Sequence, residues 1–139
     1  MFNKILVGFD GSDHARRAAQ IAGMLARQQT NAELFLVCAV DPVPPELGLP
    51  YMDQLMADRT KAGEELLRQA KDLIGADLTI HDELLFGSPA EIIMGVAENR
   101  KCDLIIMGTR GLGGLRGLLL GSQIQKVISL ANCPVLAVK

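Results

Sequence analysis

The chain has 139 residues, and its 14 Lys and Arg against 16 Asp and Glu give a formal net charge of −2 at pH 7. Apolar residues make up 49% of the sequence, which excludes an intrinsically disordered chain and predicts a single domain over residues 1–139. The slightly acidic charge and the 4% aromatic content argue against a nucleic-acid partner, because they provide neither a basic patch for duplexes nor a stacking platform for single strands.

The N-terminal third of the chain contains two apolar runs with a helical pattern between them. Residues 4–9 are apolar on both faces, as in a central strand of a parallel sheet, and residues 10–13 form a turn with helix N-cap residues. Residues 33–40 predict a second buried strand, which a proline-rich loop follows. The helix between these strands carries alanines at helical spacing, a face that packs closely against a sheet: Ala15, Ala18, Ala19, Ala22 and Ala26.

The middle of the chain continues the alternation of helix and strand. Residues 51–74 are rich in Leu, Ala, Glu, Lys and Arg and predict a long helix, and residues 77–86 predict a third strand. The next helix is expected to start with Ser88 as its N-cap and Pro89 in its first turn, with Glu91 completing a capping box.

The C-terminal part of the chain adds two strands, a loop and a helix. Residues 103–107 and 134–138 are short apolar runs that predict the fourth and fifth strands, and a glycine-rich loop occupies residues 108–121. The last helix is predicted from an apolar stripe with the spacing i, i+3, i+4 and i+7: Ile124, Val127, Ile128 and Ala131.

Three cysteines, Cys38, Cys102 and Cys133, stand far apart among apolar residues, and the sequence has no CxxC motif. This pattern predicts buried free thiols in a reducing compartment, and the wide separation of the two histidines argues against a structural zinc site. The start of the chain lacks the apolar core of a signal peptide, and no apolar run approaches the ~20 residues that span a bilayer. We therefore expect a cytoplasmic protein without a membrane partner.

Strands and helices that alternate in this way predict an α/β fold with a parallel sheet and helices on both faces. In such doubly wound sheets, ligands bind outside the carboxyl ends of the strands, where the strand order reverses. That rule selects three segments as a binding region: residues 8–12, residues 40–41, and the chain from Gly108 onward.

The segment that starts at Gly108 has the composition of a phosphate cradle. Glycine lets a ligand approach the backbone closely, and the N-terminus of the following helix offers unpaired N–H groups to an anion. Ser122 adds a hydroxyl group, and Arg110 and Arg116 add positive charge. A surface loop with an ordinary helix N-cap remains the alternative. The glycines of the segment are Gly108, Gly111, Gly113, Gly114, Gly117 and Gly121.

Other phosphate-binding and catalytic motifs do not match this chain. A Walker A loop needs Lys after its second glycine, whereas Ser122 follows Gly121, and the first strand is followed by GFDGS rather than GxGxxG. GxSxG, HIGH and SGGxDS motifs do not occur. A phosphoacceptor receiver domain would need an Asp at the end of the third strand, where the chain has Phe86 and Gly87.

The spacing Gly108-x2-Gly111-x9-Gly121-Ser122, the opening KILVGFDGSDHA and the ending ANCPVLAVK are more specific than the glycine content. On these residues the whole chain resembles the universal stress protein family, specifically the ATP-binding branch that carries G-x2-G-x9-G-(S/T) before its last helix. The resemblance implies a five-stranded parallel sheet of order 3-2-1-4-5, in a Rossmann-like, adenine nucleotide α-hydrolase-like fold.

The resemblance also implies ATP as the cofactor, with or without Mg²⁺ held by its phosphates. Carried over by position, the adenine and ribose side is lined by Gly8, Phe9 and Asp10, with backbone groups of Val40 at the adenine edge. The residues implied to flank ribose and phosphates are Met107, Gly108, Arg110 and Gly111. Those implied to line the phosphates, through backbone N–H groups and the serine hydroxyl, are Gly121, Ser122, Gln123 and Ile124.

Two features limit what the resemblance implies about activity. Ile124 stands where ATP-binding members often have Ser or Thr, and losing that hydroxyl contact to a charged group is worth about 1–3 kcal/mol. Asp10 is the one carboxylate expected near the phosphates, and it has the alternative role of forming an Asx turn. We expect a regulatory nucleotide ligand in the stress response; the alternatives are a nucleotide-free dimeric scaffold and a weak ATPase.

The last strand predicts a homodimer. Residues 134–138 are uncharged and apolar, and in the implied strand order they form an edge of the sheet. An exposed apolar edge promotes aggregation unless it is covered or paired. Antiparallel pairing with the same strand of a second chain would cover it through an isologous interface, and coverage by a helix or loop is the alternative.

Overall fold

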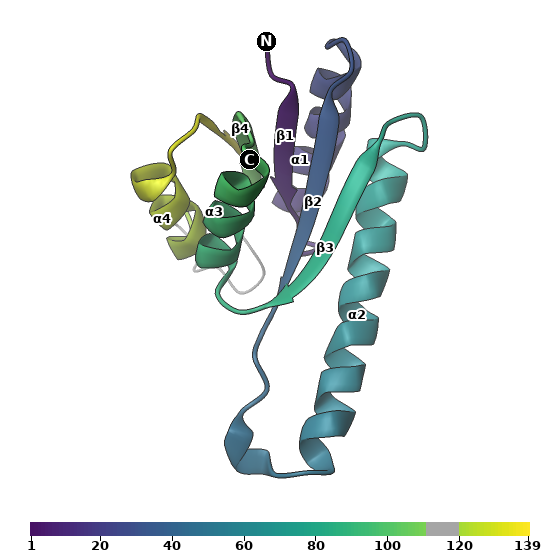
Figure 1. Ribbon diagram of the computed structural model, residues 1–139, viewed down its shortest axis with the longest axis vertical. Coiled ribbons are helices and arrows are strands. Elements are labelled where there is room, and N and C mark those ends of the chain that lie inside the picture. Colours follow the sequence, from purple (N-terminus) through teal and green to yellow (C-terminus); the bar gives the residue numbers. More distant parts are fainter. Residues whose placement is uncertain (111–119) are drawn as a thin grey trace.

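A computed structural model describes residues 1–110 and 120–139 of the chain (Figure 1). Its strands form one parallel sheet in the order β3-β2-β1-β4-β5, which confirms the predicted 3-2-1-4-5 order. The strands are β1 (Lys4–Gly8), β2 (Glu33–Val40), β3 (Ile80–Phe86), β4 (Leu104–Gly108) and β5 (Val135–Val138). The helices are α1 (Asp13–Arg27), α2 (Tyr51–Ile74), α3 (Pro89–Arg100) and α4 (Ser122–Leu130), with a 3-10 turn, η1 (Pro45–Leu47), before α2.

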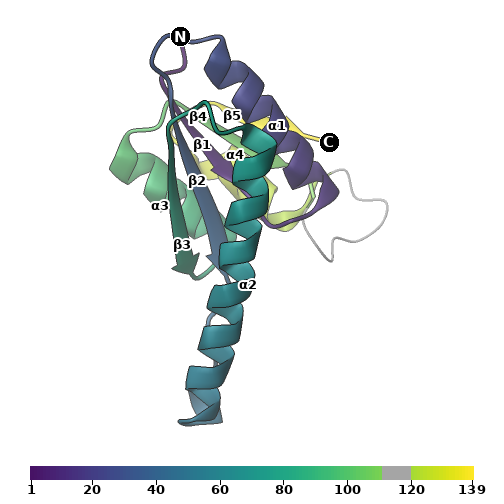
Figure 2. The same ribbon diagram turned by 90° about the vertical axis from the view of Figure 1, so that its right-hand side faces the viewer.

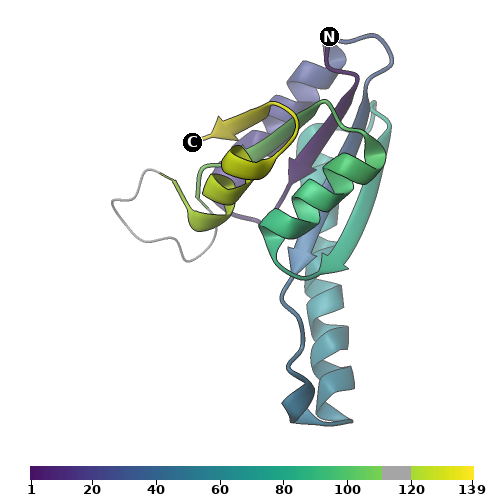
Figure 3. The same ribbon diagram turned by 60° about the vertical axis from the view of Figure 1, so that its left-hand side comes forward.

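The helices cover the two faces of the sheet in pairs, as Figures 2 and 3 show. Helices α1 and α2 pack on one face, and α3 and α4 pack on the other. The central strand β1 is apolar on both faces because each face meets a helix layer, and Ile5, Leu6 and Val7 have no exposed surface. The right-handed crossovers of a doubly wound sheet give this arrangement.

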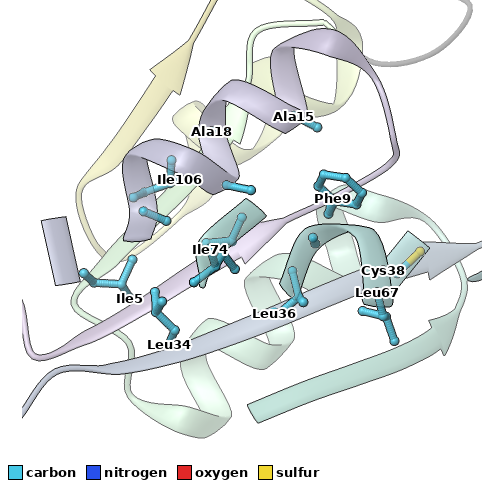
Figure 4. Packing of buried hydrophobic residues seen from close by; sticks show 14 of the residues in the cluster. Ile5, Phe9, Ala15, Ala18, Leu34, Leu36, Cys38, Leu67, Ile74 and Ile106 are labelled. Carbon is cyan, nitrogen blue, oxygen red and sulfur yellow. The ribbon is translucent and has the colours of Figure 1, made fainter. Parts of the chain in front are cut away.

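The alanine face of α1 makes the predicted close contact with the sheet. Ala18, Ala19 and Ala22 have no exposed surface, and Figure 4 shows this side of the core, with Ala18 near Ile106 of β4. Small side chains let the helix backbone approach the sheet so closely that a Cβ atom added to Gly108 would lie 2.9 Å from the backbone nitrogen of Ala15. The N-terminus of α1 is therefore fixed beside the end of β4.

The borders of two strands differ from the prediction. β1 ends at Gly8, so Phe9 follows the strand, although its side chain is buried in the core. β3 begins at Ile80 rather than at residue 77, because the C-cap of α2, Gly75, has φ +109° and Asp77 pairs with Arg27 of α1. The alternation in residues 77–79 therefore belongs to a turn.

Only the C-terminal half of α2 packs on the sheet, and its N-terminal half extends beyond the sheet's edge (Figure 1). Cys38 and Cys102 are buried free thiols, as predicted, whereas Cys133 is only partly buried. In the described part of the chain, none of the helices has both the length and the apolar character that crossing a membrane requires.

Candidate functional site

A cavity of about 380 Å³ lies at the carboxyl ends of β1, β2 and β4, the edge that the sequence selects for ligand binding. Its size falls within the range of roughly 300–1,000 Å³ that is usual for small-molecule sites. The structure brings most of the predicted contact residues together on its wall: Gly8, Phe9, Asp10, Met107, Gly108, Arg110, Gly121, Ser122, Gln123 and Ile124.

Two predicted contact residues are not placed at the cavity. Val40 belongs to the apolar core below α1 and α2, and its carbonyl oxygen accepts a hydrogen bond of 2.9 Å from the Gly87 N–H. Its neighbours Ala39 and Asp41 line the cavity instead. Gly111 lies outside the described residues, as do Arg116 and the glycines at 113, 114 and 117.

The cavity wall also contains residues that sequence reasoning did not assign to it. Ala15 comes from the start of α1, Val37 comes from β2, and Pro89 and Ile93 come from α3. Ser12 is also on the wall, and it belongs to the predicted segment 8–12. At the end of β2 the strand-end rule selects Val40 and Asp41, and of these the structure places Asp41 at the cavity, together with Ala39. No signal in the sequence indicates α3, because its approach to the cavity depends on how the helix packs across the sheet.

Asp10 stands at the turn between β1 and α1. Its Oδ1 accepts a hydrogen bond of 2.9 Å from the Ser12 N–H, which is the Asx turn considered as its alternative role. Gly11 between them has φ +84°, a conformation that favours glycine. The Ser12 hydroxyl caps α1 by accepting from the Ala15 N–H at 3.2 Å. The turn therefore fixes the Asp10 carboxylate at the wall of the cavity.

The N-terminus of α4 is open toward the cavity. Its N-cap residue is Gly121, which has no side chain to accept a hydrogen bond from the first turn. Among the described residues, no side chain caps the N–H groups of Ser122, Gln123 and Ile124. The positive end of the helix dipole and unpaired N–H donors favour an anion at such a position.

Thr109 holds the start of α4 against the end of the sheet. Its carbonyl oxygen accepts from the Gly121 N–H at 2.7 Å, and its own N–H donates to the Val138 carbonyl at 2.7 Å. Its hydroxyl is 2.7 Å from Nδ1 of His14, and the residue is only 4% exposed. The position of α4 is therefore tied both to the end of β5 and to α1.

The capping box predicted for α3 is wrong. The Ser88 side chain makes no capping bond, and its hydroxyl donates to Oε1 of Gln123 at 3.3 Å. The same oxygen accepts from the Ala90 N–H at 3.0 Å. A side chain from α4 thus replaces the local cap, because α3 and α4 begin side by side at the cavity.

The charges on the cavity wall have both signs. Arg110 supplies a cation, and the carboxylates are Asp10 and Asp41, so a second acid joins the one that the sequence indicates. Burial and, to a smaller extent, the charge of Asp10 raise the pKa of the Cys38 thiol to about 11. This thiol remains protonated at neutral pH and does not supply a nucleophile. In the described ranges, no three His, Cys, Asp or Glu side chains form a group that could hold a metal ion.

Comparisons with known proteins agree with this architecture. The chain is 46% identical over 140 residues to the "Universal stress protein in QAH/OAS sulfhydrylase 3'region" of Thermus aquaticus, with 100% of both chains covered. The structure matches universal stress protein UspA from Lactobacillus plantarum with a TM-score of 0.87 and 25% identity, covering 99% of this chain and 98% of the other.

A universal stress protein solved in complex with cAMP matches with a TM-score of 0.74 and 32% identity, covering 99% of this chain and 97% of the other. The sequence model of the universal stress protein family matches residues 1–139. The chain therefore belongs to the universal stress protein family.

Proposed function

We propose that the protein binds ATP, or a related adenine nucleotide, in the cavity at the strand ends and that the nucleotide acts as a regulatory ligand in a stress response. The phosphates lie at the N-terminus of α4, and the adenosine lies toward the ends of β1 and β2. The observation that carries this proposal is the uncapped first turn of α4, which opens into a cavity of about 380 Å³.

Three further features support a phosphorylated ligand. The Arg110 side chain is on the wall of the cavity, where its charge complements a phosphate. Gly8 keeps the end of β1 free of a side chain beside Ile93 and Met107 on the cavity wall, so a nucleotide can lie against the backbone there. A relative with 32% identity and a TM-score of 0.74 has been solved with cAMP, an adenine nucleotide.

Ile124 affects the strength of binding rather than its position. The side chain is 2% exposed and packs in the core below α3 and α4, while its backbone N–H remains in the first turn of α4. The residue therefore offers an N–H group but no hydroxyl. Any Mg²⁺ that accompanies ATP is held by the phosphates. The missing hydroxyl at Ile124 favours the alternative function, a nucleotide-free scaffold.

Hydrolysis is at most slow in this proposal. Rapid phosphoryl transfer needs a positioned water or base together with stabilisation of the γ-phosphate charge. The Asp10 carboxylate is already engaged by the Ser12 N–H. Asp41 is exposed, at the end of β2.

Thermal unfolding with and without Mg·ATP tests nucleotide binding. A ligand at 100 times its Kd adds about 2.7 kcal/mol to the free energy of unfolding, which raises the Tm of a domain of this size by on the order of 10 °C. We expect such a rise with ATP and no rise with inorganic phosphate at the same concentration. A Tm that millimolar ATP, ADP and AMP all leave unchanged would support the nucleotide-free scaffold instead.

We further propose that the protein forms a homodimer through residues 134–138. β5 is at the edge of the sheet, and the exposed apolar side chains around it are Leu136, which is 36% exposed, and Ile128 and Leu130 of α4, at 47% and 65%. Pairing with a second copy covers this edge and these side chains together.

The variant Leu136→Lys tests the dimer. A lysine at this position places a charge within the proposed interface, so we expect the mass in solution to fall from twice 15.0 kDa to 15.0 kDa at micromolar concentration. Light scattering after gel filtration measures the mass. Met56→Lys makes the same kind of change at an exposed residue of α2, on the far side of the sheet, and should remain dimeric. A wild-type mass of 15.0 kDa, or a dimeric Leu136→Lys variant, would contradict the proposal.

A further inference from the structure

The Gln123 side chain connects the first turns of α4 and α3. Its Oε1 accepts hydrogen bonds from the Ala90 N–H at 3.0 Å and from the Ser88 hydroxyl at 3.3 Å. The start of α3 needs this acceptor, because Ser88 does not cap the helix and the Ala90 N–H is one of the first-turn donors without a partner inside the helix. The carboxamide is therefore held in one place by the neighbouring helix.

This contact also fixes which end of the carboxamide faces α3. A backbone N–H can only donate, so the atom that meets the Ala90 N–H must be the carbonyl oxygen. The Nε2 group then points away from the start of α3 and has no hydrogen-bond partner among residues 1–110 and 120–139. Gln123 lines the cavity, as Ser122 and Pro89 do, so two N–H donors of fixed orientation are available at its wall.

We propose that the Gln123 side chain is a specificity-determining donor, whose Nε2 binds a phosphate oxygen of the nucleotide. This inference rests on the proposed function, and it adds a side-chain contact to the backbone N–H groups of α4. It also explains why α4 rather than α3 receives the anion. The Ala90 N–H is already occupied by Oε1, whereas no side chain in the described part of the chain caps the first turn of α4.

The variant Gln123→Glu separates the two ends of the carboxamide. One carboxylate oxygen continues to accept from Ala90 and Ser88, while the other replaces the N–H donors with a negative charge beside the phosphate. Losing a hydrogen bond to a charged group and adding repulsion should weaken ATP and AMP binding at least roughly tenfold. Adenosine has no phosphate, so its affinity should stay the same.

Gln125→Glu is the matched control, because it makes the same change two residues further along α4, at an exposed position. The Gln125 side chain bonds to the Leu120 carbonyl and does not line the cavity. It therefore measures how much a negative charge near the start of α4 weakens binding without touching the ligand. We expect less than a threefold change in ATP affinity for this variant.

Gln123→Met distinguishes a ligand contact from a structural role, because methionine removes the acceptor as well as the donor. The Tm without ligand should fall for Gln123→Met and remain near the wild-type value for Gln123→Glu, which keeps the cap of α3. ATP affinity should fall most for Gln123→Glu. If Gln123 only joined the two helices, affinity would follow stability and methionine would be the weaker binder.

Isothermal titration calorimetry of adenosine, AMP and ATP into the wild-type protein and the three variants measures these affinities. The inference holds if Gln123→Glu selectively loses the phosphorylated ligands. It is overturned if that variant binds ATP as the wild-type protein does, or loses adenosine to the same extent. If the wild-type protein binds none of the three, the proposed function fails and this inference fails with it.

Discussion

Replacing Gly121 with Val is expected to abolish the thermal stabilisation by ATP. Gly121 is the N-cap of α4 and lines the cavity, and an added isopropyl group there would occupy the approach to the N–H groups of the first turn. The variant should lose the whole contribution of ATP to the free energy of unfolding, which is about 2.7 kcal/mol when ATP is present at 100 times the wild-type Kd. Parallel melting curves with and without Mg·ATP measure it.

The fold should tolerate this substitution. Gly121 has φ −72° and ψ 165°, an extended conformation that any residue adopts, so valine introduces no backbone strain. The Tm without nucleotide should therefore change little. Gly121→Ala adds a single methyl group and should retain part of the ATP shift. An unchanged shift in the valine variant would mean that the phosphates bind elsewhere.

Replacing Gly108 with Ala is expected to destabilise the fold itself. A Cβ atom at this position would lie 2.7 Å from Cβ of His14 and 2.9 Å from the backbone nitrogen of Ala15. Because a helix backbone cannot move aside as a flexible side chain can, α1 must shift away from β4. Overpacking of this kind costs about 1–3 kcal/mol, and urea unfolding at 25 °C measures it.

Gly95→Ala is the matched control for Gly108→Ala. Gly95 is in the interior of α3, and a Cβ atom there would meet no atom within 4 Å. The same added methyl group should stabilise the protein by about 0.5–1 kcal/mol, because alanine favours the helix over glycine. If both substitutions changed stability in the same direction, the close contact between α1 and the end of β4 would be disproved.

The topology could be predicted because its physical signals are local and repeated. Runs such as residues 4–9 are apolar on both faces, which only a strand between two helix layers needs. Four such runs and one alternating segment, with helical patterns between them, leave few arrangements besides a doubly wound parallel sheet. The alanine spacing in α1 further indicated which helix approaches the sheet most closely.

The borders and caps were less predictable because they depend on contacts between distant segments. The residues before β3 have a strand-like pattern, but the pairing of Asp77 with Arg27 keeps them in a turn. Ser88 has the sequence of a local cap, yet Gln123 supplies the acceptor to α3. These two segments are 35 positions apart in the sequence.

The position of the candidate site could be predicted from a general rule, but the full set of residues that line it could not. The ends of parallel strands select Gly8, Asp10 and Gly108 from the strand pattern alone. Pro89 and Ile93 reach the same cavity only because α3 crosses the sheet beside α4. The chemistry of the wall was therefore only partly predicted, and Asp41 adds a second carboxylate to the expected Asp10.

The most direct test of the account is a crystal structure of the protein grown with ATP. We expect phosphate oxygens within hydrogen-bond distance of the N–H groups of Ser122, Gln123 and Ile124, with the adenosine toward the ends of β1 and β2. An empty cavity at saturating ATP would contradict the central claim, and so would phosphates bound away from the first turn of α4.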